Sequence, residues 1–350
     1  MAHHGFGVSG DTDPDLPLSP EGVTYHVTCT SEHLADRIVL VGDPGRVKLV
    51  CTHLDAGSIV YEAAHREINV ATGAYRGVPV TVLSTGMGTD NVEIVMNEVH
   101  ILKEYDTQRR RWRTRVGETP ADELDVPFDP STVKLIRVGT CGTPNDDVPV
   151  GCLVITQYAV GMDNTCQYYV APEVNATADV QEVLAKVRTT SLGSVQIYAT
   201  KAAPAITQGL VEACAALNAK ASAASPQEQQ PRAQQQQQWY VGTTCSGSGF
   251  YGCQGRSVGR FHGRLTAPHL TEELGDLRFD VSEGPQRIAN IEMENSALCY
   301  LSNMLGYQAG TVCVVVARRT RTGRAFASPA QTATALSNAI TVALETLIAT

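Results

Sequence analysis

The segment "RIVLVGDPGR", residues 37–46, passes from a run of aliphatic residues directly into a turn of Gly, Asp and Pro. A short apolar run that ends in turn residues predicts a buried strand. Further segments of this character, several of them ending in Gly, lie at 78–88, 133–142, 151–160, 239–247 and 310–319. Between them, apolar residues recur at helical spacing in 90–105, 178–190, 203–220, 292–305 and 328–349. This alternation predicts an α/β fold with a largely buried sheet.

The chain has 350 residues, of which 43% are hydrophobic and 18% charged, and its net charge is −9. This length suits one large α/β domain or two smaller ones. The acidic balance argues against nucleic acid as the main partner, because phosphate backbones bind basic surfaces. No apolar run approaches the roughly 18 residues of a membrane helix, and residues 1–20 lack the apolar core of a signal peptide. We therefore expect a cytoplasmic protein without membrane contact.

The ten cysteines are many for such a chain, but none form a Cys-x-x-Cys pair. Cys141, Cys152 and Cys313 lie within apolar strand-like runs. We interpret the cysteines as reduced core residues of a cytosolic protein, with disulfides as the alternative.

Two segments interrupt the alternation. Residues 106–129 begin with "DTQRRRWRTRVGE" and end acidic, and residues 218–238 consist mainly of Ala, Ser, Pro and Gln. Neither segment is expected to bury enough apolar surface to offset chain entropy, so both are predicted to be mobile insertions. The arginine cluster could be a nucleic-acid patch, but a solvated loop fits an acidic protein better.

The predicted strand ends carry groups that suit an oxyanion. Gly42 and Arg46 follow the first strand, and Arg137 and Thr140 lie at the end of another, in "LIRVGTCG". Arg66, in "AHREI", adds a third arginine. Guanidinium groups pair bidentately with phosphate oxygens, and ligands of α/β folds collect at the carboxyl ends of strands. Alone, "GDPGR" could equally be a tight turn.

In order and spacing, these pieces resemble the nucleoside phosphorylase family, and within it the uridine phosphorylases. The resemblance covers residues 25 to about 345 apart from the two insertions, and runs through "GDPGR", "HRE", "STGMG", "IRVGTCG", "FYGCQGR" and "IEMENSA". It implies a central mixed, partly barrel-like sheet flanked by helices in a three-layer fold. One catalytic domain, 25–350, would follow a flexible arm, 1–24.

The resemblance also implies a role for each matching residue. Those expected to bind phosphate are Gly42, Arg46, Arg137, Thr140 and, from the neighbouring subunit, Arg66. Those expected to bind ribose are Glu292, Met293, Glu294 and, from the partner, His26. Those expected to bind the base are Cys141, Gly142, Phe250, Gln254 and Arg256, with Gln254 and Arg256 on one face of an extended segment. Arg137, Arg256 and Glu294 would act in catalysis.

The implied assembly is a homodimer, or an assembly of dimers, with shared active sites. Some relatives hold a cation on the dimer axis, and the matching positions are Glu67, Met87 and Asn91, with Asp90 as an additional carboxylate. Oxygen ligands with added negative charge favour calcium over potassium. In the alternative interpretation, Asp90 and Asn91 only cap a helix.

Several of the other assignments also have structural alternatives. His26 could lie on a loose arm, and Glu292 could cap its helix or form a salt bridge. Phe250 and Met293 could belong to the core, and Gln254 and Arg256 could lie on a solvated loop.

The implied activity is the reversible phosphorolysis of uridine to uracil and ribose 1-phosphate in pyrimidine salvage, with phosphate as co-substrate and no cofactor. The chain departs from the pattern at 246–249 ("SGSG"), at Gly252 and at Arg318–Arg319. It also lacks the aspartate that purine-specific relatives place near the last of these. Alternatives are a phosphorylase of broader specificity, including deoxyuridine, thymidine or purine nucleosides, and a non-catalytic nucleoside-binding protein.

Overall fold

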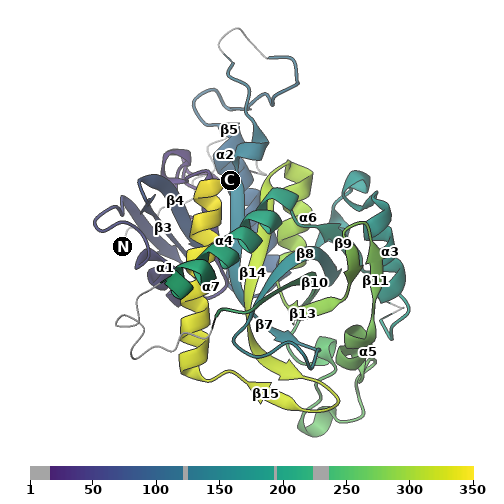
Figure 1. The fold of residues 1–350 in the computed structure, drawn as a ribbon. Coiled ribbons are helices and arrows are strands. Elements are labelled where there is room, and N and C mark those ends of the chain that lie inside the picture. Colours follow the sequence, from purple (N-terminus) through teal and green to yellow (C-terminus); the bar gives the residue numbers. More distant parts are fainter. Residues whose placement is uncertain (1–15, 121–124, 193–194, 224–235) are drawn as a thin grey trace.

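The computed structural model describes residues 16–120, 125–192, 195–223 and 236–350. Within them, one mixed sheet of eleven strands runs through the molecule (Figure 1). Its strands are β1 (Arg37–Val41), β2 (Tyr61–His65), β3 (Ile68–Tyr75), β4 (Val78–Ser84), β7 (Lys134–Thr143), β8 (Leu153–Met162), β9 (Tyr198–Lys201), β10 (Trp239–Gly247), β13 (Ile288–Glu292), β14 (Gln308–Arg319) and β15 (Arg324–Phe326). Two short hairpins lie outside it: β5 (Tyr105–Asp106) with β6 (Arg111–Trp112), and β11 (Phe279–Val281) with β12 (Gly284–Gln286).

Part of the sheet closes on itself. Strand β14 pairs with β7 in parallel and with β8 in antiparallel orientation, and β10 and β13 complete the ring between β8 and β7. From β7 the sheet continues as an open extension through β1, β4, β3 and β2. The expected mixed and partly barrel-like sheet is therefore confirmed.

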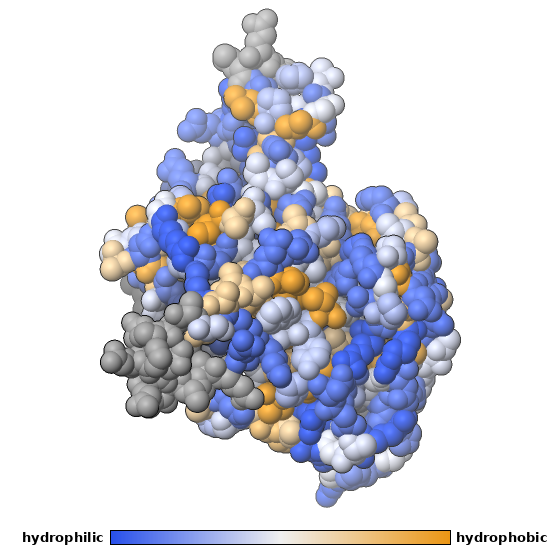
Figure 2. Space-filling view, in the orientation of Figure 1, coloured by the Kyte–Doolittle hydropathy of each residue, from blue (hydrophilic) through white to orange (hydrophobic). Residues whose placement is uncertain are grey.

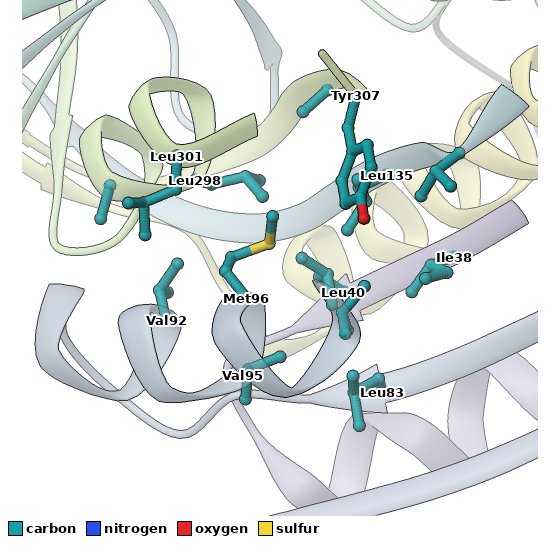
Figure 3. Packing of buried hydrophobic residues seen from close by; sticks show 14 of the residues in the cluster. Ile38, Leu40, Leu83, Val92, Val95, Met96, Leu135, Leu298, Leu301 and Tyr307 are labelled. Atoms are coloured by element: carbon teal, nitrogen blue, oxygen red, sulfur yellow. The ribbon is translucent and has the colours of Figure 1, made fainter. Parts of the chain in front are cut away.

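Helices flank the open part on both sides and also cover the closed ring. They are α1 (Pro44–Cys51), α2 (Thr89–Glu104), α3 (Ala178–Val187), α4 (Pro204–Ala223), α5 (Leu270–Asp276), α6 (Asn295–Leu305) and α7 (Pro329–Ala349). Alternate residues of β1 serve the two layers: Ile38 and Leu40 pack with α2 and α6, as Figure 3 shows, whereas Val39 and Val41 pack with α1, α4 and α7. This accounts for the aliphatic run at 37–41, because both faces of the strand are buried.

Helix α7 is, by length and composition alone, apolar enough to cross a membrane. It crosses the sheet beside α4 (Figure 1), and one face of it, including Ala339, Ile340 and Ala343, lies in the same core cluster as Val39. This packing is that of a core helix. All ten cysteines lie in the described residues, and all are free thiols.

The first predicted insertion contains secondary structure of its own. The described residues of the 106–129 segment lie beyond the end of α2 (Figure 1) and are folded, since β5 pairs with β6 and Arg115 bridges to Phe128. Phe128 joins the core, and the Arg113 guanidinium lies 4.8 Å from its ring centroid, so the segment contributes at least one buried apolar side chain. Figure 2 shows apolar residues on this segment amid hydrophilic ones.

The second insertion starts later than predicted, because α4 continues to Ala223; residues 224–235 lie outside the described residues. Of the predicted arm, residues 1–15 also lie outside them, while the part at 16–24 folds back in a turn closed by the Leu18–Thr24 bridge. Whether the arm and the two insertions are mobile stays a prediction.

Candidate active site

A cavity of about 900 Å³ opens near the carboxyl ends of β1, β4, β7, β10, β13 and β14. All the predicted site residues line it except His26, Arg66 and Asp90. Those that do are Gly42, Arg46, Glu67, Met87, Asn91, Arg137, Thr140, Cys141, Gly142, Phe250, Gln254, Arg256, Glu292, Met293 and Glu294. Residues that lie as far apart as 42 and 294 in the sequence thus meet around one space.

One end of the cavity is suited to an anion. Helix α1 begins there at Pro44, and the Asp43 side chain caps it by accepting from Gly45 N at 2.8 Å. A side chain at position 42 would come within 3.3 Å of the Gly86 carbonyl, a tight contact that glycine avoids. Arg46 donates to the Val138 carbonyl at 3.2 Å. A helix N-terminus with an adjacent guanidinium favours phosphate.

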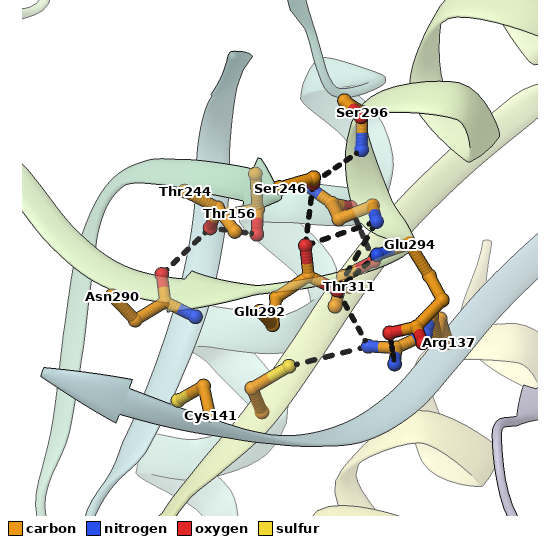
Figure 4. Close-up of polar contacts among 12 residues, drawn as sticks. Arg137, Cys141, Thr156, Thr244, Ser246, Asn290, Glu292, Glu294, Ser296 and Thr311 are labelled. Atoms are coloured by element: carbon orange, nitrogen blue, oxygen red, sulfur yellow. Dashed lines mark hydrogen bonds and ion pairs between the residues drawn. The ribbon is translucent and has the colours of Figure 1, made fainter. Parts of the chain in front are cut away.

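Arg137 is buried between two carboxylates (Figure 4). Its Nη1 lies 3.1 Å from Glu292 Oε2, and its Nη2 pairs with Glu294 Oε2. Burial lowers the pKa of Arg137, but Glu294 and Glu292 outweigh that effect and hold it above the usual value. The guanidinium stays charged and anchors both carboxylates.

The Glu292 carboxylate is occupied by internal donors. Ser246 Oγ donates to its Oε1 at 2.5 Å, and the backbone amides of Glu294 and Asn295 donate to it at 3.0–3.1 Å. Burial, together with the nearby Glu294, raises its pKa to about 7, although Arg137 acts in the opposite direction. Its contacts are those of the structural alternative, in which Glu292 caps α6 and forms a salt bridge.

The start of α6 was predicted wrongly. The helical pattern at 292–305 suggested that the helix includes Glu292, but α6 begins at Asn295 and Glu292 ends β13. Strand β13 escaped notice because its short apolar run, closed by acidic residues, carries no turn signal. Glu294, just before α6, also accepts from Gly88 N at 2.8 Å, and this contact binds it to the N-terminus of α2.

The other end of the cavity presents an amide and a guanidinium. Gln254 is buried, and the Arg256 guanidinium lies 4.1 Å from the ring centroid of Phe250. Phe250 is 50% exposed, so it is not ordinary core. Burial, with repulsion from Arg319, lowers the pKa of Arg256 to about 10, so its cation persists at neutral pH.

Gln254 and Arg256 converge for a different reason than predicted. The segment is not extended: Gly252–Gln254 form a 3₁₀ turn, and Gly255 has φ +65°. A side chain at 255 would lie 2.7 Å from the Pro268 carbonyl, so only glycine fits this turn. The sharp turn, rather than strand alternation, brings both side chains to the same cavity.

The departures from the family pattern form contacts of their own. Ser246 holds Glu292 and accepts from Ser296 N at 2.9 Å. The Gly249 carbonyl accepts from the Cys253 thiol at 2.6 Å and from Gln254 Nε2 at 3.5 Å. These hydrogen bonds connect the altered segment to Glu292 on one side and to Gln254 on the other.

Sequence analysis missed several residues around the cavity. Val316, Ala317, Phe326 and Ala327 line it from β14 and β15. The β15 segment has no alternation that could have revealed a strand. Arg319 lines a small adjoining cavity beside Gln254 and Arg256. Arg319 Nη1 and Arg256 Nε have no hydrogen-bond partner among the described residues, so each retains a donor for a ligand or a water molecule.

His26 and Arg66 lie together outside the cavity wall. The ring centroids of Tyr25 and His26 are 4.6 Å apart. The Arg66 guanidinium lies 5.9 Å from the ring centroid of Tyr25, on which both residues thus pack. His26 is not on a loose arm, because its ring Nδ1 lies 2.7 Å from the buried Glu98 carboxylate. Arg66 has φ +55°, a strained conformation for a side-chain-bearing residue.

Three of the four predicted cation ligands are neighbours. Asn91 Nδ2 donates to Glu67 Oε1 at 3.2 Å and to the Met87 carbonyl at 3.3 Å. Asp90 does not join them, because it accepts from Thr165 Oγ1 at 3.0 Å. The described residues contain no group of three or more His, Cys, Asp or Glu side chains that could hold a metal. The added carboxylate expected from Asp90 is therefore not placed at this site.

The chain is similar to known nucleoside-cleaving enzymes. It is 27% identical over 331 residues to a uridine phosphorylase of Thermococcus kodakarensis, covering 95% of this chain and 90% of that protein. A DeoD-type purine nucleoside phosphorylase of Lactococcus lactis subsp. cremoris is 31% identical over 136 residues, which are 39% of this chain and 46% of that one.

Solved structures give the same grouping. A Trypanosoma brucei nucleoside phosphorylase, described as showing uridine phosphorylase activity, superposes with a TM-score of 0.89 at 49% identity and covers 96% of this chain and 100% of that one. A uridine phosphorylase of Phytophthora capsici, at 21% identity, a TM-score of 0.67 and coverage of 96% and 98%, supports the fold alone. Residues 36–349 match the phosphorylase superfamily model. The protein therefore belongs to the phosphorylase superfamily.

Proposed function

We propose that the protein is a uridine phosphorylase, which converts uridine and phosphate reversibly to uracil and ribose 1-phosphate. The observation that carries this proposal is that one cavity is lined both by groups that suit an anion and by an amide and a guanidinium that suit a nucleobase. Arg46 and the start of α1 lie at the anion end, and Gln254 and Arg256 lie at the other. The Arg137–Glu294 pair lines the same cavity.

The reaction as proposed has two substrates, uridine and phosphate, and uses no cofactor. A phosphate oxygen forms a bond to C1′ as the bond between C1′ and uracil N1 breaks, and the electron pair of that bond leaves with uracil. The cationic character that develops on the sugar is stabilised by the phosphate anion and by the Glu294 carboxylate. Gln254 and Arg256 hold the uracil anion, which takes a proton from water.

Base selectivity follows from the donors at this end. An amide can pair with the N3 and O2 edge of uracil and a guanidinium with O4. The carboxylates that line the cavity among the described residues are Asp43, Glu67, Glu292 and Glu294, and none of them lies on the loop of Gln254 and Arg256. A phosphorylase of broader specificity is the second candidate, because part of the chain also matches a purine nucleoside phosphorylase.

The active form is proposed to be a homodimer, alone or within an assembly of dimers. Exposed apolar side chains near the start of α2 support this: Met87 is 77% exposed, Tyr168 81% and Val170 92%. In the dimer that we propose, His26 and Arg66 of one chain reach the other chain's cavity. His26 would then contact the ribose 5′-hydroxyl and Arg66 the phosphate.

A cation at the dimer axis is a separate proposal. The oxygens of Glu67 and Met87 both face the Asn91 amide, and turning that amide would bring a third oxygen to the same point. Two copies would then supply about six oxygen ligands, which suits calcium or potassium.

We expect the purified protein to hold about one cation per dimer and to melt at a lower temperature after chelation. Asn91→Ala should abolish the cation content, whereas Asn97→Ala, on the exposed face of the same helix, should not. Elemental analysis and thermal melts measure both. A metal-free wild-type protein with an unchanged melting temperature after chelation would contradict the site.

We also infer a place in pyrimidine salvage and in the cytoplasm. The reversible release of a free base from a nucleoside is a salvage reaction. The ten unpaired cysteines, most of them buried, suit a reducing compartment.

Uracil release from uridine is expected to require inorganic phosphate and to yield ribose 1-phosphate in equal amount. Arg46 and the α1 N-terminus have no comparable use in a reaction with water. The measurement is absorbance of uracil and assay of the sugar phosphate with and without phosphate, with inosine as the comparison substrate. Equal turnover without phosphate would indicate a nucleosidase, and faster cleavage of inosine than of uridine would contradict the base assignment.

A further inference from the structure

A buried carboxylate, Asp163, lies just beyond the end of β8 and outside the cavity lining. Only 4% of the residue is exposed. Its Oδ1 accepts from Thr165 N at 2.9 Å, and both its oxygens lie 3.0 Å from the Tyr198 hydroxyl. Ser296 Oγ donates to its Oδ2 at 3.2 Å.

Asp163 has no cationic partner among the described residues. Burial raises its pKa, and the surrounding donors of Thr165, Tyr198 and Ser296 offset this only in part. Burying a carboxylate without a counter-ion is costly. A group of this kind is retained where its hydrogen bonds fix a geometry that apolar packing would not fix.

From Asp163, one set of contacts leads to the carboxylates of the cavity through α6. Ser296 is the second residue of α6 and donates its backbone amide to Ser246 Oγ at 2.9 Å. Ser246 in turn donates to Glu292, which pairs with Arg137 (Figure 4). Ser296 thus donates to Asp163 through its hydroxyl and to Ser246 through its backbone amide, and the Ser246 hydroxyl accepts from Ser296 and donates to Glu292.

A second set of contacts leads from Asp163 to α2. The Oγ1 of Thr165 lies 2.8 Å from the Thr89 hydroxyl and donates to Asp90 at 3.0 Å. Thr89 is the first residue of α2, and the amide of Gly88 immediately before it donates to Glu294. Asp163 is therefore linked to the N-termini of both helices that meet at Glu294.

We propose that Asp163 is a positioning residue of the active site: by binding the N-termini of α2 and α6 it fixes the distance between Gly88 N and Arg137, and so the orientation of Glu294. The inference rests on the proposed function for its kinetic test. Asp163 acts through other residues and touches no substrate.

Two tyrosines offer a matched test. Tyr198 donates to Asp163, and Tyr307 donates to another buried carboxylate, Glu104, at 2.7 Å. Both tyrosines are buried in the same core cluster, but Tyr307 follows the far end of α6. Replacing either by Phe removes one hydroxyl and keeps the ring.

Tyr198→Phe is expected to lower kcat for uridine about fivefold, the effect of one lost hydrogen bond, with KM for phosphate unchanged. Tyr307→Phe should leave kcat within about twofold of the wild type. Its loss of thermal stability should be similar to that of Tyr198→Phe. Should Tyr198→Phe fold poorly, Ser296→Ala removes the other hydroxyl that donates to Asp163 and should show the same change in kcat. Equal kcat values in the two tyrosine variants would overturn the proposal.

Amide hydrogen exchange gives a readout that does not depend on the substrate. Faster exchange at residues 86–90 in Tyr198→Phe, but not in Tyr307→Phe, is the expected result, because the Gly88 contact with Glu294 loosens. If wild-type protein fails to cleave uridine but the exchange difference is present, the proposed function is wrong and the positioning role stands. Unchanged exchange in both variants overturns the positioning role.

Discussion

Arg256→Ala is expected to reduce uridine turnover by a factor of about 100 to 1,000, the usual effect of removing a donor aimed at developing charge. The guanidinium lies against the half-exposed Phe250 ring in the cavity wall and remains charged at neutral pH, since its pKa is lowered only to about 10. The negative charge on departing uracil would otherwise meet only Gln254 and Arg319. Initial rates of uracil release at saturating phosphate measure the loss in kcat.

The control for this prediction is Arg260→Ala. Arg260 lies in the same loop but is exposed, and its loss should leave turnover near that of the wild type. Arg256→Lys should recover little activity, because a lysine cannot reproduce the planar pair of donors. A fall in turnover of less than about fivefold in Arg256→Ala would show that the base anion is held elsewhere.

Co-expressing Arg66→Ala chains with Glu294→Ala chains is expected to restore about a quarter of the wild-type activity, although each variant alone is nearly inactive. If Arg66 serves the partner's cavity, a mixed dimer has one site with both defects and one with neither. Random association makes about half of the dimers mixed. The measurement is the specific activity of the unfractionated co-expressed protein, and mixed dimers isolated from it through two different affinity tags should show about half of the wild-type activity.

The matching negative control pairs Arg137→Ala with Glu294→Ala. These residues form an ion pair within one chain, so every site in their mixed dimer carries a defect and no activity should return. If the Arg66 and Glu294 pair also fails to recover, Arg66 acts within its own chain or not at all, and the shared site is refuted.

Site residues could be placed from the sequence where they directly follow a segment whose secondary structure is easily recognised. Gly42 could be placed beside an anion site because a buried aliphatic strand ends immediately before it. The order of strands around the closed ring could not be read in the same way, because β13 gives a short apolar run and pairs with elements far away in the chain. The resemblance supplied the barrel, and hydrophobic patterning alone did not.

Site residues were harder to place where contacts cross between elements. Glu292 was assigned to ribose, yet its carboxylate is engaged by Ser246, Arg137 and two backbone amides. Nothing local marks Ser246 or Asp163 as its support, since Ser246 lies 46 residues from Glu292 in the sequence and Asp163 lies 133 residues from Ser296. Arg319 was noticed only as a departure from the family pattern, although it lies against the cavity that adjoins Gln254.

The two ends of the cavity are carried by different parts of the sheet. The anion end of the cavity is attached to the open extension, at β1 and β4, whereas the base end is attached to β10 and the β14–β15 hairpin. Strand β7 joins both parts, and its pairing with β14 over ten residue positions fixes one against the other. The residues that follow β10, where this chain departs from the family pattern, can therefore vary without moving those at the other end of the cavity. Under the proposed function, base preference can change in this way while phosphate binding is kept.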